Sequence, residues 1–174
     1  MPTRIPVVKW FLAVSVLLLL APPAAEATVG PGRIARYGVS VTVPGRWDGR
    51  IYRRPGGLPI LHVANFRLPA NDDDPGTKAS MRMGSRGIFI VVLEWDAKTG
   101  FTHVRLPIQI RRSDFLPGFK GIPVSHAFAQ RRFETSNRSF SLWVQFGRRK
   151  LSNAMLGRAN TVIGTLLITA HRFP

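Results

Sequence analysis

The sequence predicts an α+β domain built on a mainly antiparallel sheet, with one amphipathic helix packed on a face near the C-terminus and a final strand after it. Short apolar segments bounded by Pro and Gly outnumber helical ones, and several follow one another closely, as the two arms of a hairpin do. Only residues 151–163 carry apolar side chains at convincing helical spacing. The chain has 174 residues, 45% of them hydrophobic, which suffices for one domain with its own core.

The domain is predicted at residues 36–174, after a flexible leader at residues 28–35 that contains Gly, Pro and Gly in succession. Valine alternates with Ser and Thr over residues 39–43, which predicts a half-buried strand. Pro and Gly end this strand, and a short apolar segment at residues 51–52 follows. We therefore expect residues 38–53 to form a hairpin.

The middle of the chain alternates between strands and loops. Residues 58–68 predict a third strand, residues 71–76 a loop, and residues 77–83 a short helix. Residues 88–95 are almost continuously apolar and rich in Ile and Val, which favours a strand buried on both faces near the centre of the sheet. Residues 101–123 contain several Pro and Gly residues and predict no regular element.

The C-terminal part predicts a hairpin followed by the helix. Its arms are residues 124–133 and 140–146, and alternate side chains of the second arm share one face. The helix at residues 151–163 ends at a glycine, and residues 165–170 predict a final strand that pairs in the sheet.

Residues 1–27 resemble an export signal peptide. A basic start precedes an apolar run at residues 10–21, and small residues at positions 25 and 27 predict cleavage after Ala27. The run is shorter than the about 20 residues that a transmembrane helix needs. The alternative is an uncleaved membrane anchor that begins at Ile5. Both interpretations place the domain outside the cytoplasm, either secreted or anchored to the membrane.

Two parts of the sequence resemble the PsbP-like family of α/β/α sandwiches: the opening at residues 37–47 and the helix at residues 159–163 that runs into an apolar segment at residues 166–168. The resemblance covers residues 37–53 and 124–170. It implies a sandwich fold and a non-enzymatic, extracytoplasmic accessory or binding role. The middle departs from the family, being shorter and rich in proline, and no family ligand or metal residue maps onto it.

Residues for catalysis or metal binding are not grouped. The chain has no cysteine, which excludes disulfides, thiolate metal sites and cysteine nucleophiles. The four histidines fall in separate elements without zinc-site spacing, so neither a metal nor a cofactor is expected. The run Asp72, Asp73 and Asp74 lacks the ligand spacing of a calcium loop and is interpreted as a solvated turn.

The candidate catalytic pairs are weak as well. Ser125 and His126 are adjacent, so on a strand their side chains point to opposite faces. Glu94 and Asp96 flank a tryptophan at a strand end, and neither accompanies a nucleophile motif. We therefore expect a protein that is not an enzyme, while an unrecognised active site remains an alternative.

Positive charge is the main functional signal. Lys and Arg number 25 against 9 Asp and Glu, a net charge of +16, and removal of residues 1–27 takes away two cations and one anion. Clusters at predicted strand ends and loops make up a candidate anion-binding set: Arg111, Arg112, Arg131, Arg132, Arg148, Arg149 and Lys150. Guanidinium groups form bidentate bonds to phosphates and carboxylates. The competing interpretation is a compositional excess of arginine on a solvated surface.

The hypothesis is thus an exported, non-enzymatic accessory or binding module whose basic surface contacts an anionic lipid or wall polymer. Nucleic acid is not expected, because the protein is exported and shows no DNA-reading or RNA-binding signature. The alternative is an accessory subunit that docks a protein partner through an apolar patch around Trp47 or Trp143. The oligomeric state is left open.

Overall fold

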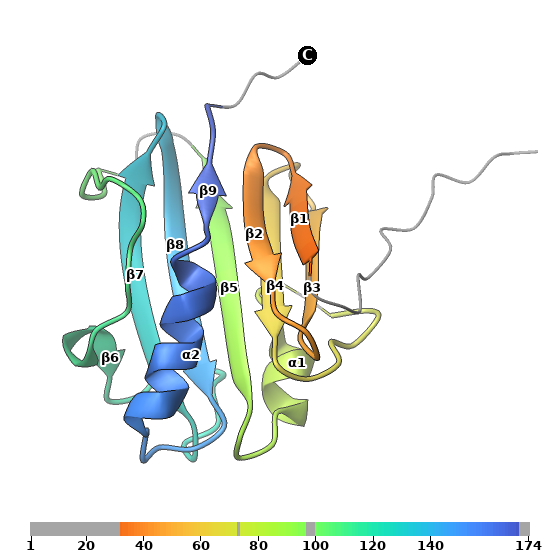
Figure 1. Cartoon of the computed structure of the whole chain (residues 1–174), viewed down its shortest axis with the longest axis vertical. Helices are drawn as coiled ribbons and strands as arrows, with labels where there is room; N and C mark the ends of the chain where they lie inside the picture. Colours follow the sequence, from red (N-terminus) through yellow and green to blue (C-terminus); the bar gives the residue numbers. More distant parts are fainter. Residues whose placement is uncertain (1–31, 73, 97–99, 171–174) are drawn as a thin grey trace, which may run out of the picture.

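The computed structural model describes residues 32–72, 74–96 and 100–170 (Figure 1), so the predicted signal peptide lies outside the described residues. The fold is α+β, with mostly antiparallel sheets and two helices, as predicted. The elements are β1 (Gly32–Arg36), β2 (Val39–Val43), β3 (Asp48–Arg53), β4 (Pro59–Ala64), α1 (Thr77–Arg82), β5 (Ile88–Trp95), the 3-10 turn η1 (Arg112–Asp114), β6 (Phe115–Leu116), β7 (Ala127–Thr135), β8 (Arg138–Phe146), α2 (Asn153–Ile163) and β9 (Leu167–Ile168).

The strands form two sheets. A six-stranded sheet has the order β3-β4-β5-β8-β7-β6, and a three-stranded sheet has the order β1-β2-β9. The small sheet and α2 lie on the same side of the large sheet in Figure 1. No helix among the described residues is long and apolar enough to cross a membrane.

The N-terminal predictions need two corrections. Residues 32–35, assigned to a flexible leader, belong to β1 and pair with β2. The predicted hairpin over residues 38–53 is wrong, because β2 pairs with β1 and β9 whereas β3 pairs with β4 in the other sheet. The alternating valines did identify a strand, but alternation does not specify which neighbour the strand pairs with.

The centre of the large sheet agrees with the prediction for residues 88–95. Strand β5 lies between β4 and β8, and all its residues except Trp95 are buried. Strand β8 is buried along its whole length, including the polar Ser139, Ser141 and Gln145. These three lie on the face of the sheet that points away from α2. That face is covered by α1 and by the segment around Phe119.

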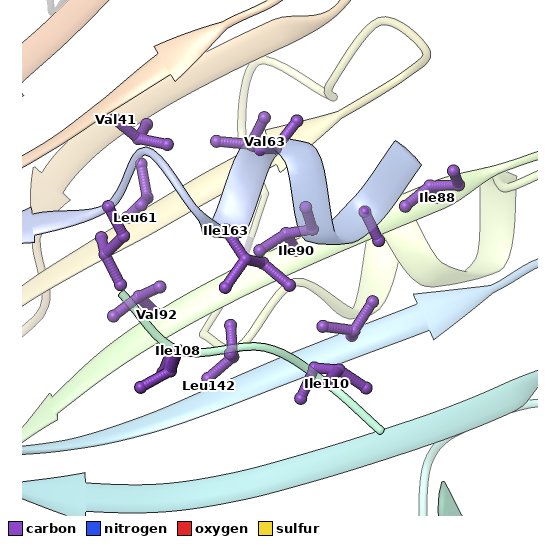
Figure 2. Packing of buried hydrophobic residues seen from close by; sticks show 14 of the residues in the cluster. Val41, Leu61, Val63, Ile88, Ile90, Val92, Ile108, Ile110, Leu142 and Ile163 are labelled. Atoms are coloured by element: carbon purple, nitrogen blue, oxygen red, sulfur yellow. The ribbon is translucent and has the colours of Figure 1, made fainter. Parts of the chain in front are cut away.

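Two apolar cores result, one on each face of the large sheet. Figure 2 shows part of the larger core, in which Val41 of β2, Ile163 of α2 and Ile108 contact side chains of the large sheet. The smaller core lies on the opposite face and includes Phe89 and Trp143. Burial of these clusters is the main favourable contribution to folding.

Helix α2 confirms the predicted helix at residues 151–163, with its start two residues later. The Ser152 side chain caps it by accepting a hydrogen bond from the Met155 N–H at 3.2 Å. After the helix, β9 has only two residues and pairs with β2, so the final strand joins the small sheet. The Asn160 amide holds Ile110 by two hydrogen bonds of 2.8 and 3.0 Å, which fixes part of the irregular segment on the helix.

A buried ion pair joins the two sheets. Arg138 of β8 donates to both carboxylate oxygens of Glu94, at 2.8 and 2.6 Å. The same guanidinium donates to the carbonyls of Tyr37, Gly38 and Thr169, which flank the strands of the small sheet. This charge pair therefore links the two sheets, and the guanidinium is fully hydrogen-bonded, as a buried cation must be.

Candidate anion-binding site at one end of the sheet

Strand register brings one set of loops together at one end of the large sheet. At this end, Asp48 pairs with Ala64 and Ala64 with Phe89, and the neighbouring Ile88 pairs with Phe146, which also pairs with Ala127. The chain leaves or enters the strands here through loops that carry cations but few anions. We call this the basic end, and define it by eight exposed residues: Arg46, Arg67, Arg86, Arg111, Arg112, Arg148, Arg149 and Lys150. It is the lower end of the sheet in Figure 1.

Hydrogen bonds hold the separate segments of the basic end side by side. Arg112 Nη2 donates to Asn153 Oδ1 at 2.7 Å, which places η1 against the start of α2. Arg149 Nη2 donates to the Pro117 carbonyl at 3.2 Å. The Gly147 N–H donates to the Gly87 carbonyl at 3.0 Å, beside Arg86. These contacts bring the predicted clusters at residues 111–112 and 148–150 together.

Glycine is required at the close approach between these loops. A Cβ on Gly147 would collide with the backbone of Gly84, in the turn that precedes β5. The close backbone contact places Arg148 next to that turn.

Arg131 and Arg132 do not belong to the basic end, contrary to the sequence prediction. Both lie in the middle of β7, where consecutive side chains point to opposite faces. Arg131 donates to the Gln109 carbonyl at 2.9 Å, on the face that carries α2. Arg132 lies 5.7 Å from the centre of the Phe101 ring, on the other face. Adjacent arginines in a strand cannot both serve one surface.

The sequence did not predict three residues of the basic end, namely Arg46, Arg67 and Arg86. Each is a single arginine in its own loop, so no local clustering marked it. Arg46 and Arg67 flank a cleft of about 320 Å³ whose other lining residues are Trp47, Asp48 and Phe66. Within the described parts of the chain, no hydrogen bond or ion pair engages either of these two guanidinium groups.

The carboxylates of the described residues are mostly engaged inside the protein. Asp48 is buried and accepts from the Leu68 N–H at 2.9 Å, and Asp114 accepts from the Arg111 N–H at 2.7 Å. Glu134, at the opposite end of the sheet, accepts from Ser139 at 3.1 Å. No fully exposed carboxylate therefore offsets the cations of the basic end among the residues described, which leaves a positive potential there.

Neither tryptophan of the alternative hypothesis forms an apolar surface patch. Trp47 is 5% exposed and Trp143 is 8% exposed. The Arg158 guanidinium lies 5.7 Å from the centre of the Trp47 ring. Phe119 packs against Trp143, with 5.5 Å between ring centres. Both indoles serve the packing of the domain, because other side chains cover them.

The predicted solvated turn at Asp72 is also wrong. Its carboxylate is fully buried, with Oδ2 3.4 Å from His62 Nδ1 and Oδ1 accepting from the Ala79 N–H at 3.1 Å. The Tyr52 hydroxyl lies 3.3 Å from Nε2 and 3.5 Å from Nδ1 of the same imidazole. Sequence reasoning missed this cluster because the loop returns over the strand only in the folded protein.

Burial lowers the pKa of His62 below its ordinary value, so the imidazole is neutral at pH 7. For Asp72, burial would raise the pKa, but His62 and the Ala79 N–H outweigh it and the pKa is lowered. The pair is thus a neutral imidazole beside a carboxylate, and it holds the loop onto the sheet.

The described residues contain no group of three or more His, Asp or Glu side chains that could hold a metal ion. Comparison of the chain with protein-family models, with curated proteins and with solved structures gives no match. The functional argument therefore depends on the geometry and charge of the basic end.

Proposed function

We propose that this chain is an exported, non-enzymatic accessory or binding module whose basic end contacts an anionic component of the cell envelope. The supporting observation is the grouping of eight exposed cations from separate loops, without an exposed carboxylate beside them in the described structure. Arginine dominates the set, and its planar guanidinium suits phosphate and carboxylate groups.

The dimensions of the basic end favour an extended partner. It runs along six strands, which at about 4.8 Å between neighbours spans roughly 24 Å. A single small anion would contact only part of it, whereas a polymer or a surface with repeated charges would contact several loops at once. The cleft between Arg46 and Arg67 would hold one such anionic group.

The contrast between the two ends argues against a merely compositional excess of arginine. At the far end, Arg36 and Arg53 lie over the Tyr37 ring, at 4.8 and 4.7 Å from its centre. Arg54 pairs with Asp74 at 3.2 Å, and Arg138 pairs with Glu94. These four far-end cations thus have partners inside the protein, whereas Arg46 and Arg67 at the basic end have none within the described residues.

Export is part of the proposal and has its own test. Sequencing the N-terminus of the chain recovered from its source should give a start at Thr28, which the predicted cleavage after Ala27 would produce. Recovery from the membrane with Met1 retained would select the anchored alternative. A cytosolic chain with Met1 retained would contradict export.

The PsbP-like type of fold is likewise proposed. A central antiparallel sheet with α2 on one face and α1 on the other supports it.

The binding test uses two anionic probes, soluble poly(glycerol phosphate) and vesicles containing phosphatidylglycerol. The site variant is Arg148→Ser, Arg149→Ser, Lys150→Ser. The control variant is Arg36→Ser, Arg53→Ser, Arg105→Ser, which removes the same charge from exposed positions towards the far end. Residues 138–146 of β8 separate the two ends by roughly 27 Å, which exceeds the Debye length of about 10 Å in 0.1 M salt.

For the wild type we expect binding to at least one probe, weakening steeply as salt is raised. The site variant should bind about 100-fold more weakly, because each cation near an anionic surface contributes about 1 kcal/mol. The control should retain most of the affinity. Absence of binding to both probes at low salt, or equal losses in the two variants, would overturn the proposal.

A further inference from the structure

The end of β6 and the loop that joins it to β7 expose large apolar side chains at the basic end. Leu116 is 40% exposed, Phe119 37% and Val124 88%, all within nine residues of chain. Such a group in an otherwise charged surface indicates contact with an apolar phase or partner. We refer to residues 116–124 as the apolar loop.

The apolar loop is fixed in position beside the cations. The Phe119 ring stacks on Phe128, with 4.6 Å between centres, so the loop is anchored on the smaller core. Arg149 holds the Pro117 carbonyl, and it lines a cavity of about 90 Å³ together with Leu116 and Val124. Exposed apolar side chains and the Arg149 cation therefore lie side by side on this surface.

The point where the chain enters the domain is at the same end. Gly32 pairs with Val43, and the Val43 side chain lies against Gly49 at the start of β3. The apolar run at residues 10–21 precedes Gly32 by ten residues, which can span at most about 35 Å. If that run is retained as an anchor, the chain returns from the bilayer to the basic end.

From the exposed apolar loop and the cations beside it we infer that the anionic partner is a lipid bilayer, and that the apolar loop inserts into its interface while the cations contact phosphate groups. The inference rests on the proposed function and names its partner. A bilayer offers negative charge and an adjoining apolar layer together. A wall polymer offers the charge alone and leaves Leu116 and Val124 in water.

The first experiment separates lipid from polymer. The variant is Leu116→Gln, Val124→Gln, at two exposed positions, and the matched control is Leu167→Gln, a side chain 48% exposed in β9. We expect the loop variant to lose about tenfold in affinity for phosphatidylglycerol vesicles while binding poly(glycerol phosphate) as the wild type does. The Leu167→Gln control should bind both probes normally.

The second experiment detects insertion directly. Because the chain has no cysteine, Val124→Cys can be labelled with an environment-sensitive fluorophore at that position alone. Its emission should shift to the blue on vesicles of phosphatidylcholine with phosphatidylglycerol, but not on phosphatidylcholine alone. The same label on Leu167→Cys should not shift.

The outcomes distinguish the two proposals. An unchanged Val124→Cys label together with full vesicle affinity of the loop variant overturns insertion, while salt-sensitive binding through Arg148, Arg149 and Lys150 keeps the basic end as the anion site. Binding to poly(glycerol phosphate) without binding to vesicles selects the polymer and overturns the bilayer. Failure of the wild type to bind either probe overturns the proposed function itself.

Discussion

Arg138 shows how much of the architecture depends on one side chain. Its guanidinium satisfies both oxygens of Glu94 and three carbonyls near the small sheet. Removing the cation leaves a buried carboxylate without a partner. This lowers the free energy of unfolding much more than loss of an exposed ion pair does.

We predict that Arg138→Met lowers the free energy of unfolding by about 3–5 kcal/mol, measured by urea denaturation. The double variant Arg138→Met, Glu94→Gln should recover part of the loss, because the buried charge is then gone. Arg132→Met, at an exposed position in the same hairpin, should change stability by less than about 0.5 kcal/mol. If Arg138→Met also lowered the free energy of unfolding by less than about 0.5 kcal/mol, the buried ion pair would not stabilise the fold as argued.

The His62–Asp72 pair predicts how stability depends on pH. The pKa of His62 is lowered on folding, so the unfolded chain takes up a proton that the folded domain does not, and stability falls as pH drops below about 6.5. The lowered pKa of Asp72 adds a second loss below about pH 4.

As the pH is lowered from about 7.5 to about 5, the range of histidine titration, the melting temperature should fall. His62→Gln should flatten that dependence while lowering stability at neutral pH. His126→Gln is the comparison, because burial lowers the pKa of that histidine too and its removal should flatten the curve in part. An unchanged slope in His62→Gln would exclude the buried pair as the cause.

Residue types alone could not predict this pair. His62 lies within the predicted strand at residues 58–68 and is buried there, but Asp72 was predicted in a solvated turn. The contact depends on the loop after β4 folding back over the sheet, a long-range arrangement without a sequence signal. Arg46 and Arg67 were missed for the same reason, since their loops meet only across the cleft.

At the scale of elements, periodicity predicted the strands at residues 39–43 and 88–95 and the helix at residues 151–163 well. Periodicity did not predict which strands pair with each other, since β2 and β3 follow each other in sequence but enter different sheets. The β7–β8 hairpin was predicted with a longer loop than it has. Its turn is only Ser136 and Asn137, both with positive φ, which matches the twist of tight hairpins.

The cap of α2 gives a prediction at the element scale. Ser152→Ala should lower the free energy of unfolding by about 1 kcal/mol, because the Met155 N–H loses its acceptor. Ser152→Asp should keep the cap, and the nearby cations should favour it further. Ser113→Ala, at an exposed position in η1, serves as the control in chemical denaturation. Equal effects of the two alanine variants would argue that the cap does not stabilise α2.

At the scale of the whole molecule, crowding of cations should make stability sensitive to anions. Phosphate or sulfate should raise the melting temperature more than chloride does at equal ionic strength, because an anion that binds the native state stabilises it. The Arg148→Ser, Arg149→Ser, Lys150→Ser variant should lose most of this difference, and the far-end control variant should keep it. Differential scanning fluorimetry measures the melting temperature of the wild type and of the two variants in each salt. The same response in all three proteins would point to a general salt effect.

The separation of charge along the strands also gives the molecule a direction. Loops at one end carry cations without an exposed carboxylate beside them in the described residues. At the other end, Glu94, Asp96 and Glu134 offset part of the positive charge of the far-end arginines. Such an uneven distribution is an electric dipole roughly parallel to the sheet. A negatively charged surface would therefore rotate the approaching domain before contact, until the β7–β8 turn points away from that surface. A larger share of encounters would then begin with the basic end facing the surface.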